Sequence, residues 1–204
     1  MEKSEYWDEI YKKKDESQQS WFEEIPEKSL EMIDELNLPQ RASIVNIGGG
    51  ESRLVDSLLE RGFSNITLLD ISKESLEKSK VRLGPKIVPI KFIVSDVTRL
   101  KTNEKYDLWH DRATFHFLTT LDDVDNYLKV AYESLNEDGY LIVSTFSKTG
   151  PESCSGLTIS KYSQEELKLV FSKYFKNTRC FETTHTTPWG TSQDFVYCGF
   201  KKIS

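Results

Sequence analysis

The sequence predicts an α/β fold in which helices cover both faces of a seven-stranded, mostly parallel sheet. Strand-like apolar segments alternate with helical patterns through the middle of the chain, which is typical of parallel strands joined by helices. A glycine turn at Gly48, Gly49 and Gly50 follows the first of these strands. Two extended segments with no helix between them follow the last helical pattern, so we expect an antiparallel hairpin at one sheet edge.

The size of the chain limits how many domains it can form. With 204 residues and 37% hydrophobic content, the chain is long enough for one complete α/β domain and too short for two substantial ones. We therefore expect one domain over residues 1–204, divided into a helical cap at 1–40 and a core at 41–204.

The helical cap is predicted from spacing in two segments. Residues 5–14 carry apolar side chains at helical intervals, so one aromatic face should pack on the domain. A second helix is expected to open at Pro26 and to run to about Leu38. The inward-facing residues should be Trp7, Ile10, Tyr11, Leu30, Ile33 and Leu36.

The core elements follow in order along the chain. Strands are expected near residues 43–47, 65–69, 90–95, 106–110 and 139–146. Helices are expected at 51–62, 72–82, 121–136 and 163–173. The terminal hairpin should pair 176–186 with 193–202.

The glycine turn and a later acidic residue predict a ligand site. Gly50 and Asp70 are 20 residues apart, which is the length of one helix and its return to a neighbouring parallel strand. Arg53 stands where a dinucleotide fingerprint has its last glycine, and no phosphate-cradle motif occurs. This favours a ligand whose adenosine lacks phosphate over hydride-transfer cofactors, although an ordinary strand-to-helix turn would also use glycines.

At these residues the chain resembles the class I S-adenosylmethionine-dependent methyltransferases. Their first motif reads acidic-x-Gly-x-Gly-x-Gly, and it aligns here with residues 46–52. Asn46 replaces the acidic residue, although its amide oxygen can still accept a hydrogen bond, and Ser52 replaces the third glycine. The resemblance covers the chain after the cap, and implies a Rossmann-like fold, S-adenosylmethionine as cofactor and S-adenosylhomocysteine as product.

The resemblance also implies roles for residues that follow the strands. Asp70 would bind the ribose hydroxyls, and Asp96 would bind the adenine amino group. Asp96 could instead be a turn or helix-cap residue, and Ile71 could belong to the core. The implied cofactor site comprises Asn46, Gly48, Gly49, Gly50, Asp70, Ile71, Asp96 and Val97.

The fourth strand ends in a polar cluster that is costly to bury without partners. His110, Asp111 and Arg112 are candidate catalytic residues, because in the family this strand end lies beside the reactive methyl group. Asp111 could orient the ligand or nucleophile, and His110 could take a proton. The competing interpretation is a structural ion network that links helix to sheet. His116 is expected to pack in the following turn.

The loop at residues 147–157 is polar and should lie over the same edge as a lid or substrate loop. Cys154 within it is interpreted as a loop cysteine more readily than as a nucleophile, because no base is evident nearby. Whether the hairpin loop with His185 and Trp189 lies near the pocket is left open.

Composition excludes several classes of protein. A net charge of -6 and a pI near 5.3 argue against a nucleic-acid surface. The three cysteines form no C-x-x-C pair, so we expect reduced cytoplasmic thiols, with neither a disulfide framework nor a zinc site. No other metal motif occurs, and no apolar run reaches the ~20 residues needed to cross a bilayer.

The methyl acceptor is predicted only as a class. Residues 6–11, 21–22 and 111–115 are similar to segments of the elongation-factor lysine methyltransferases, with Arg112 and Ala113 departing from the last motif. Similar Tyr-Trp-Asp openings occur in small-molecule methyltransferases, and we favour a small-molecule acceptor. A protein lysine and a non-catalytic cofactor-binding or interaction module are the alternatives. The sequence predicts no oligomeric state.

Overall fold

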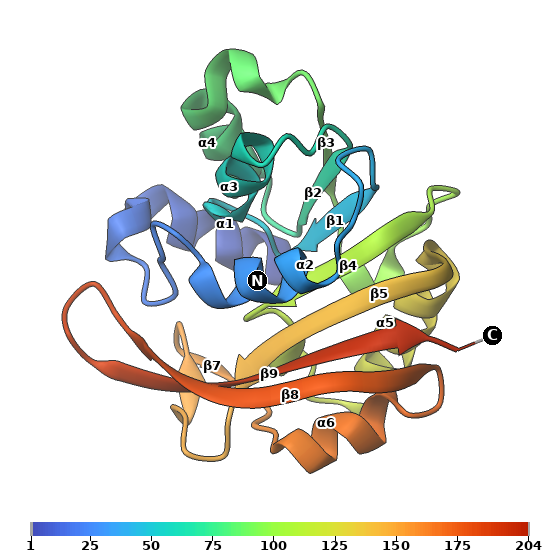
Figure 1. Ribbon diagram of the computed structural model, residues 1–204. Helices are drawn as coiled ribbons and strands as arrows, with labels where there is room; N and C mark the ends of the chain where they lie inside the picture. The colour runs from blue at the N-terminus through green and yellow to red at the C-terminus, as the bar shows by residue number, and fades with distance from the viewer. Residues whose placement is uncertain (1, 204) are drawn as a thin grey trace.

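The computed structural model describes residues 2–203 and contains one seven-stranded sheet in the order β3-β2-β1-β4-β5-β9-β8 (Figure 1). Strands β1 to β5 are mutually parallel, whereas β9 is antiparallel to both β5 and β8. The predicted Rossmann-like fold with a C-terminal antiparallel hairpin is confirmed. The strands are β1 (Ile44–Ile47), β2 (Ile66–Asp70), β3 (Ile90–Val94), β4 (Tyr106–Arg112), β5 (Leu135–Phe146), β8 (Phe175–Thr186) and β9 (Ser192–Lys202).

Helices pack on both faces of the sheet because successive strand residues point to opposite sides. Ile44 and Leu108 pack with α2, α3 and α4, whereas Val45 and Trp109 pack with α5 and α6. All four of these side chains are completely buried. The helices are α2 (Glu27–Glu35), α3 (Leu54–Glu60), α4 (Lys73–Leu83), α5 (Leu121–Ser134) and α6 (Gln164–Phe171).

The N-terminal segment folds over the glycine-turn side of the sheet (Figure 1). Helix α1 (Lys3–Lys13) contacts α4, and the short 3-10 helix Glu16–Gln18 lies between α1 and α2. Tyr11 is buried on the inner face of α1, while Trp7 and Ile10 are half-buried. The predicted aromatic face therefore packs on the domain.

Two predicted boundaries shift at the centre of the sheet. Strand β4 continues to Arg112, because Asp111 and Arg112 still pair with Val143 and Ser144 of β5. Strand β5 begins at Leu135, directly after α5. The loop that follows β5 contains a small antiparallel pair, β6 (Ser153–Cys154) and β7 (Leu157–Thr158).

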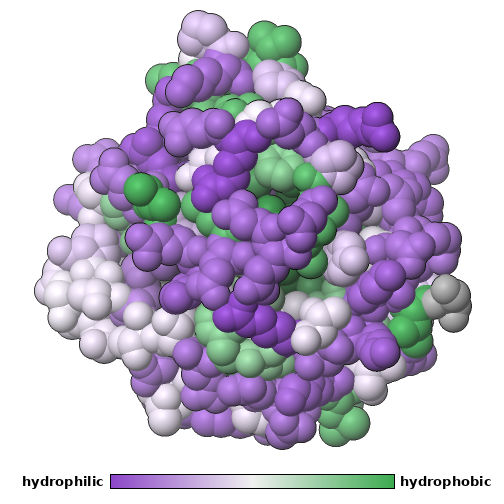
Figure 2. Space-filling model, in the orientation of Figure 1, coloured by the Kyte–Doolittle hydropathy of each residue, from purple (hydrophilic) through white to green (hydrophobic). Residues whose placement is uncertain are grey.

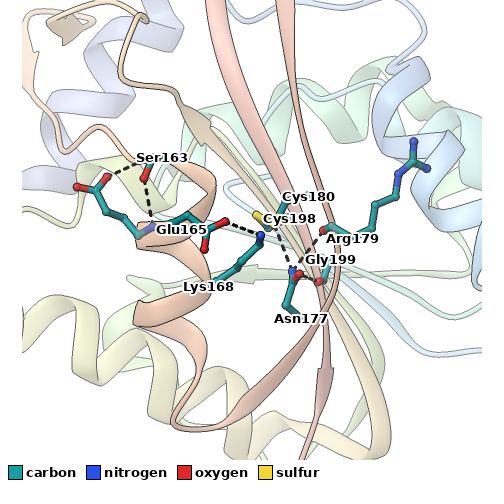
Figure 3. Close-up of a disulfide and its surroundings, with 9 residues drawn as sticks. Ser163, Glu165, Lys168, Asn177, Arg179, Cys180, Cys198 and Gly199 are labelled. Atoms are coloured by element: carbon teal, nitrogen blue, oxygen red, sulfur yellow. Dashed lines mark hydrogen bonds and ion pairs between the residues drawn. A yellow bond between two sulfur atoms is a disulfide. The ribbon is translucent and has the colours of Figure 1, made fainter.

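The expectation that all cysteines are reduced is wrong in the structure. Cys180 of β8 and Cys198 of β9 stand directly opposite each other and form a disulfide (Figure 3). The Asn177 amide donates a hydrogen bond to Cys180 Sγ at 3.2 Å, and Cys154 is a free, buried thiol. Cysteine number and the missing C-x-x-C motif could not reveal this pair, because the register of the hairpin brings it together.

The face of the molecule shown in Figure 2 is mostly hydrophilic, with small hydrophobic areas between the polar side chains. This agrees with a charged content of 29%. Within residues 2–203, no helix combines the length and the apolar character needed to cross a membrane.

Candidate functional site

A cavity of about 440 Å³ lies at the carboxyl ends of β1, β2, β3 and β4. Parallel α/β sheets bind ligands at this edge, because the loops that follow the strands diverge there. Helix α1 and the β6–β7 pair supply the opposite walls. The predicted site residues that line it are Gly48, Asp70, Ile71, Asp96, Val97 and Arg112.

The glycine turn is required first by the packing of the protein itself. A Cβ at Gly48, where φ is +57°, would lie 1.8 Å from Thr114 Oγ1. A Cβ at Gly49 would lie 2.2 Å from Leu68 Cδ1, so a side chain there would also collide. Gly50 has φ +37°, which favours glycine. Of the three glycines, only Gly48 lines the 440 Å³ cavity.

Asp70 ends β2 and is only 4% exposed, yet it lines the cavity. Its Oδ1 accepts a hydrogen bond from the Ser72 backbone N–H at 2.8 Å. Burial raises the pKa of Asp70 to about 7, while backbone N–H groups of Ser72 and Gly50 act in the opposite direction. A ligand that donates hydrogen bonds to this carboxylate would stabilise its ionised form.

Asp96 is a helix-cap residue and also lies on the cavity, so both sequence interpretations, a cap and an adenine-binding residue, fit its position. Its Oδ1 caps the short 3-10 helix Val97–Arg99 by accepting from Thr98 N at 2.9 Å and Thr98 Oγ1 at 2.7 Å. The residue also lines the cavity, beside Val97. Because the cap uses one oxygen, Oδ2 keeps its capacity to accept a hydrogen bond from a ligand.

His110 does not line the cavity. It is 1% exposed, with Nδ1 3.0 Å from Asn46 Oδ1 and Nε2 2.9 Å from Ser29 Oγ. Burial, together with the charge of Arg112, lowers the pKa of His110 to about 3, so the ring is neutral at ordinary pH. His110 therefore lies outside the cavity lining, where its hydrogen bonds connect β4 to β1 and α2.

Asp111 is also internal. Its Oδ1 accepts from the backbone N–H groups of Thr114 and Phe115, and its Oδ2 accepts from the Tyr127 hydroxyl at 2.8 Å. The residue is completely buried, which raises the pKa of Asp111 to about 7. It fixes the turn after β4 and does not line the cavity. His110 and Asp111 thus make hydrogen bonds within the protein, to residues that include Ser29 of α2 and Tyr127 of α5.

Arg112 alone of the three candidate catalytic residues reaches the cavity. Its guanidinium donates to the Trp21 carbonyl at 2.8 Å and to the Tyr197 hydroxyl at 3.2 Å, and it pairs with Glu23 at 3.0 Å. These bonds attach the segment that follows the 3-10 helix Glu16–Gln18 to strand β4 at the centre of the sheet. Arg112 thereby places Trp21 on the cavity wall.

The wall opposite the strands is aromatic, and the sequence alone did not assign it to the site. Trp7 lies 5.1 Å from Phe117 and 6.0 Å from Trp21 between ring centroids, at near-perpendicular angles. The Tyr6 hydroxyl donates to the Ser155 carbonyl at 2.5 Å, which joins α1 to the β6–β7 loop. The helical spacing of the aromatic residues was a signal for packing, but it could not show what they pack around.

Two further residues behave as the sequence suggested. Cys154 lines the cavity, but burial raises the pKa of its thiol to about 11, which makes it a poor nucleophile. His116 is buried in the turn after β4 and stacks on Phe146 with 4.6 Å between centroids.

The position of His185 had been left open. It lies away from the cavity lining, where its Nε2 donates to the Ser20 carbonyl at 2.8 Å.

Asp8 is a contact that sequence reasoning missed. Its Oδ1 accepts from Ser72 Oγ at 2.6 Å and from the Glu74 backbone N–H at 3.0 Å, at the start of α4. Lys78 of the same helix donates to the Lys14 carbonyl at 2.9 Å. These bonds hold α1 beside Asp70. An acidic residue within a charged helix gives no sequence signal for such a contact.

The sheet order and the cavity at its carboxyl edge are those of a Rossmann-like α/β protein, and comparison with known proteins identifies similar proteins. Residues 45–143 match the family model described as a methyltransferase domain. The chain is 34% identical over 118 residues to malonyl-[acyl-carrier protein] O-methyltransferase of Acetivibrio thermocellus, covering 57% of this chain and 40% of that protein. It is 25% identical over 185 residues to EEF1A lysine methyltransferase 2 of Danio rerio, covering 86% of this chain and 76% of that protein.

Solved structures share the fold. The 1,6-didemethyltoxoflavin-N1-methyltransferase of Burkholderia thailandensis, with bound substrate and S-adenosylhomocysteine, has a TM-score of 0.69 at 19% identity, covering 89% of this chain and 79% of that one. A methyltransferase of Methanosarcina mazei has a TM-score of 0.71 at 16% identity, covering 84% of this chain and 97% of that one. The chain spans less than half the length of the first curated relatives that it matches. The chain is therefore similar to methyltransferases in sequence, in agreement with the predicted resemblance, and it shares the fold of the solved methyltransferase structures.

Proposed function

We propose that this chain binds S-adenosylmethionine in the larger cavity and transfers its methyl group to a small-molecule acceptor. The observation that carries the proposal is the placement of Asp70 and Asp96 on one cavity wall, at the ends of adjacent strands. Asp70 offers a buried carboxylate to the ribose hydroxyls, and Asp96 offers Oδ2 to the adenine amino group. Ile71 and Val97 supply apolar surface for the adenine ring.

The residues present fit this cofactor. Gly48 lines the cavity without a side chain to obstruct the methionyl part, and Asn46 presents an unpartnered buried amide nitrogen nearby. The cofactor supplies an activated methyl group on its sulfonium, so the protein need only hold the nucleophile in line and exclude water. The aromatic wall and the β6–β7 loop would exclude water, and Arg112 would keep Trp21 in place.

The walls that border the cavity favour a small acceptor over a protein side chain. Helix α1 and the β6–β7 loop both border it, and the Tyr6 bond to Ser155 ties them together. The aromatic residues offer stacking surface, as flat or apolar acceptors require. The relative that acts on malonyl-[acyl-carrier protein] and the neighbour that acts on 1,6-didemethyltoxoflavin are consistent with this class.

A protein lysine acceptor is the second candidate. The match to EEF1A lysine methyltransferase 2 of Danio rerio extends over 86% of this chain, further than the O-methyltransferase match. Reaching a lysine on a protein would require α1 or the β6–β7 loop to open.

Radiolabelled S-adenosylmethionine distinguishes the candidates. The protein is incubated with a metabolite extract and, separately, with purified elongation factor, with Asp70→Asn as the matched weak-binding control. We expect label in the small-molecule fraction, and several-fold less of it with the variant at a cofactor concentration below the dissociation constant of the wild type. Label only in protein would favour the lysine reading. Binding of S-adenosylmethionine without transfer to either fraction would favour a non-catalytic module.

A further inference from the structure

Asn46 has a buried amide nitrogen without a hydrogen-bond partner among the described residues. The residue is 2% exposed, and its Oδ1 already accepts from His110. With a neutral ring, His110 Nδ1–H donates to Asn46 and Nε2 accepts from the Ser29 hydroxyl. In this arrangement the hydrogen-bond chain from α2 through β4 engages the Asn46 amide oxygen and leaves Nδ2 free. The sequence had assigned the oxygen to a ligand, but the structure engages it internally.

The free Asn46 Nδ2 points toward the glycine turn. A Cβ built on Gly49 would lie 3.0 Å from this atom. Asn46 and Gly49 line a second cavity of about 30 Å³, which shares Gly48 and Arg112 with the larger one. The amide nitrogen is therefore at the edge of the site where the turn would meet a ligand.

The acidic side chains around the second cavity already have partners within the protein. Glu23 and Glu51 also line it, but Glu23 is paired with Arg112, and Glu51 accepts from Gln19 Nε2 at 2.6 Å. Asn46 Nδ2 is a donor without a partner, so it seeks an acceptor. An amino-acid group carries such an acceptor in its carboxylate.

An asparagine differs from an acidic residue here in one respect. Either residue could accept the hydrogen bond from His110 Nδ1, so His110 does not require asparagine. Asparagine adds only the N–H donor that faces the turn, and aspartate would place a negative charge there. The substitution thus reverses the polarity offered to the ligand.

We propose that Asn46, oriented by His110, donates a hydrogen bond to the carboxylate of the ligand's amino-acid group, which makes His110 a positioning residue. The inference rests on the proposed function, because S-adenosylmethionine carries such a group. His110 acts through Asn46 and touches no ligand itself.

Calorimetric titration with four adenosine ligands tests the inference. S-adenosylhomocysteine carries both the carboxylate and the amino group, its decarboxylated and deaminated analogues each lack one, and 5′-methylthioadenosine lacks both. For the wild type we expect the decarboxylated analogue to bind at least ~10-fold more weakly than S-adenosylhomocysteine, the equivalent of about 1.4 kcal/mol. Asn46→Asp and His110→Leu should shrink this ratio toward one, while binding of 5′-methylthioadenosine stays unchanged.

Two variants separate positioning from general structural damage. His110→Asn keeps a donor near the Nδ1 position and should restore the ratio lost in His110→Leu. His116→Leu removes another buried histidine, one with no bond to Asn46, and should leave the ratio unchanged. An equal loss of affinity for all four ligands in Asn46→Asp would overturn the inference. So would a wild-type preference set by the amino group alone.

Failure of the proposed function gives a different result. In that case none of the four ligands binds the folded wild-type protein, including 5′-methylthioadenosine. If 5′-methylthioadenosine and S-adenosylhomocysteine bind but the carboxylate makes no difference, the adenosine site stands and the role of Asn46 and His110 is wrong.

Discussion

Burial decides which polar residues at the strand ends can meet a ligand. Asp70 and Asp96 keep part of their surface on the cavity, whereas His110 and Asp111 spend their hydrogen bonds inside the protein. All four stand at the carboxyl ends of β2, β3 or β4, so position in the sequence could not separate them. The difference arises from partners on α2 and α5, namely Ser29 and Tyr127, which lie far away along the chain.

Asp70 predicts a pH dependence of cofactor binding. Its folded pKa is about 7, and the ribose hydroxyls require the ionised carboxylate as acceptor. Affinity for S-adenosylhomocysteine should therefore rise as pH increases from 6 to 8. Asp70→Asn should weaken binding about 10-fold, in line with a lost hydrogen bond to a charged group, and flatten the pH profile. Calorimetry at three pH values measures both effects.

The exposed Asp122→Asn serves as the charge-matched control for Asp70 and should keep the wild-type profile. A rising profile that persists in Asp70→Asn would assign the titration to another group. Unchanged affinity in this variant would remove Asp70 from the site.

Asp111 predicts a pH-dependent contribution to stability. Its pKa rises from 3.8 in the unfolded chain to about 7 in the folded protein, so folding favours the protonated form. This contribution is fully present below pH 3.8 and is lost as pH rises through 7. Asp111→Asn cannot ionise, so its free energy of unfolding does not decrease in this way as pH rises. The variant lacks hydrogen bonds that stabilise the wild type by roughly 1–3 kcal/mol.

Urea unfolding at pH 5 and pH 8 checks the Asp111 prediction. The variant should be less stable than the wild type at pH 5, and the difference should become smaller at pH 8. A difference that grows with pH would show that the buried carboxylate is ionised and stabilising in the folded protein.

At the scale of elements, the docking of α1 depends on a few polar bonds to α4. Asp8→Ala removes the acceptor for Ser72 Oγ and Glu74 N at the start of that helix. Because a lost side-chain hydrogen bond costs about 1 kcal/mol, amide exchange in residues 3–13 should accelerate several-fold. Hydrogen exchange read by mass spectrometry measures this, with the exposed Lys12→Ala as control. Unchanged protection would mean that the aromatic face alone holds α1.

The β8–β9 hairpin predicts a thiol count. With Cys180 and Cys198 joined, only Cys154 should react with a thiol reagent in denaturant, giving one thiol per chain. After reduction the count should be three. The crosslink closes a loop of 18 residues, so reduction should cost about 3 kcal/mol of stability. Three reactive thiols before reduction would show that the pair is open in the purified protein.

The elements that the sequence predicted well are those with strong periodicity. The strands and helices of the core appear within a few residues of the expected limits, because alternation and helical spacing follow from which faces are buried. The end of β4 and the start of β5 were less accurate, since strand pairing and not local composition extends them. The cysteine pair depends on hairpin register, which no local pattern reports.

At the scale of the whole molecule, the cavity is built from segments far apart in the sequence. Gly48, Asp70 and Asp96 were predictable because parallel strands bring their ends to one edge. The sequence shows that Trp7, Trp21 and Phe117 are apolar, but it does not show that they form a cavity wall. Their place in the wall depends on how the N-terminal segment folds back over the sheet. Arg112 and His185 hold that segment through Glu23, which local sequence cannot reveal.

We expect the 440 Å³ cavity to bind S-adenosylmethionine. Calorimetric titration of the purified, ligand-stripped protein with S-adenosylmethionine and S-adenosylhomocysteine, with NAD as control, measures this binding. We expect saturable binding of the first two, one molecule per chain, and none of NAD. Absence of binding in a folded sample, or equal binding of NAD, would contradict it.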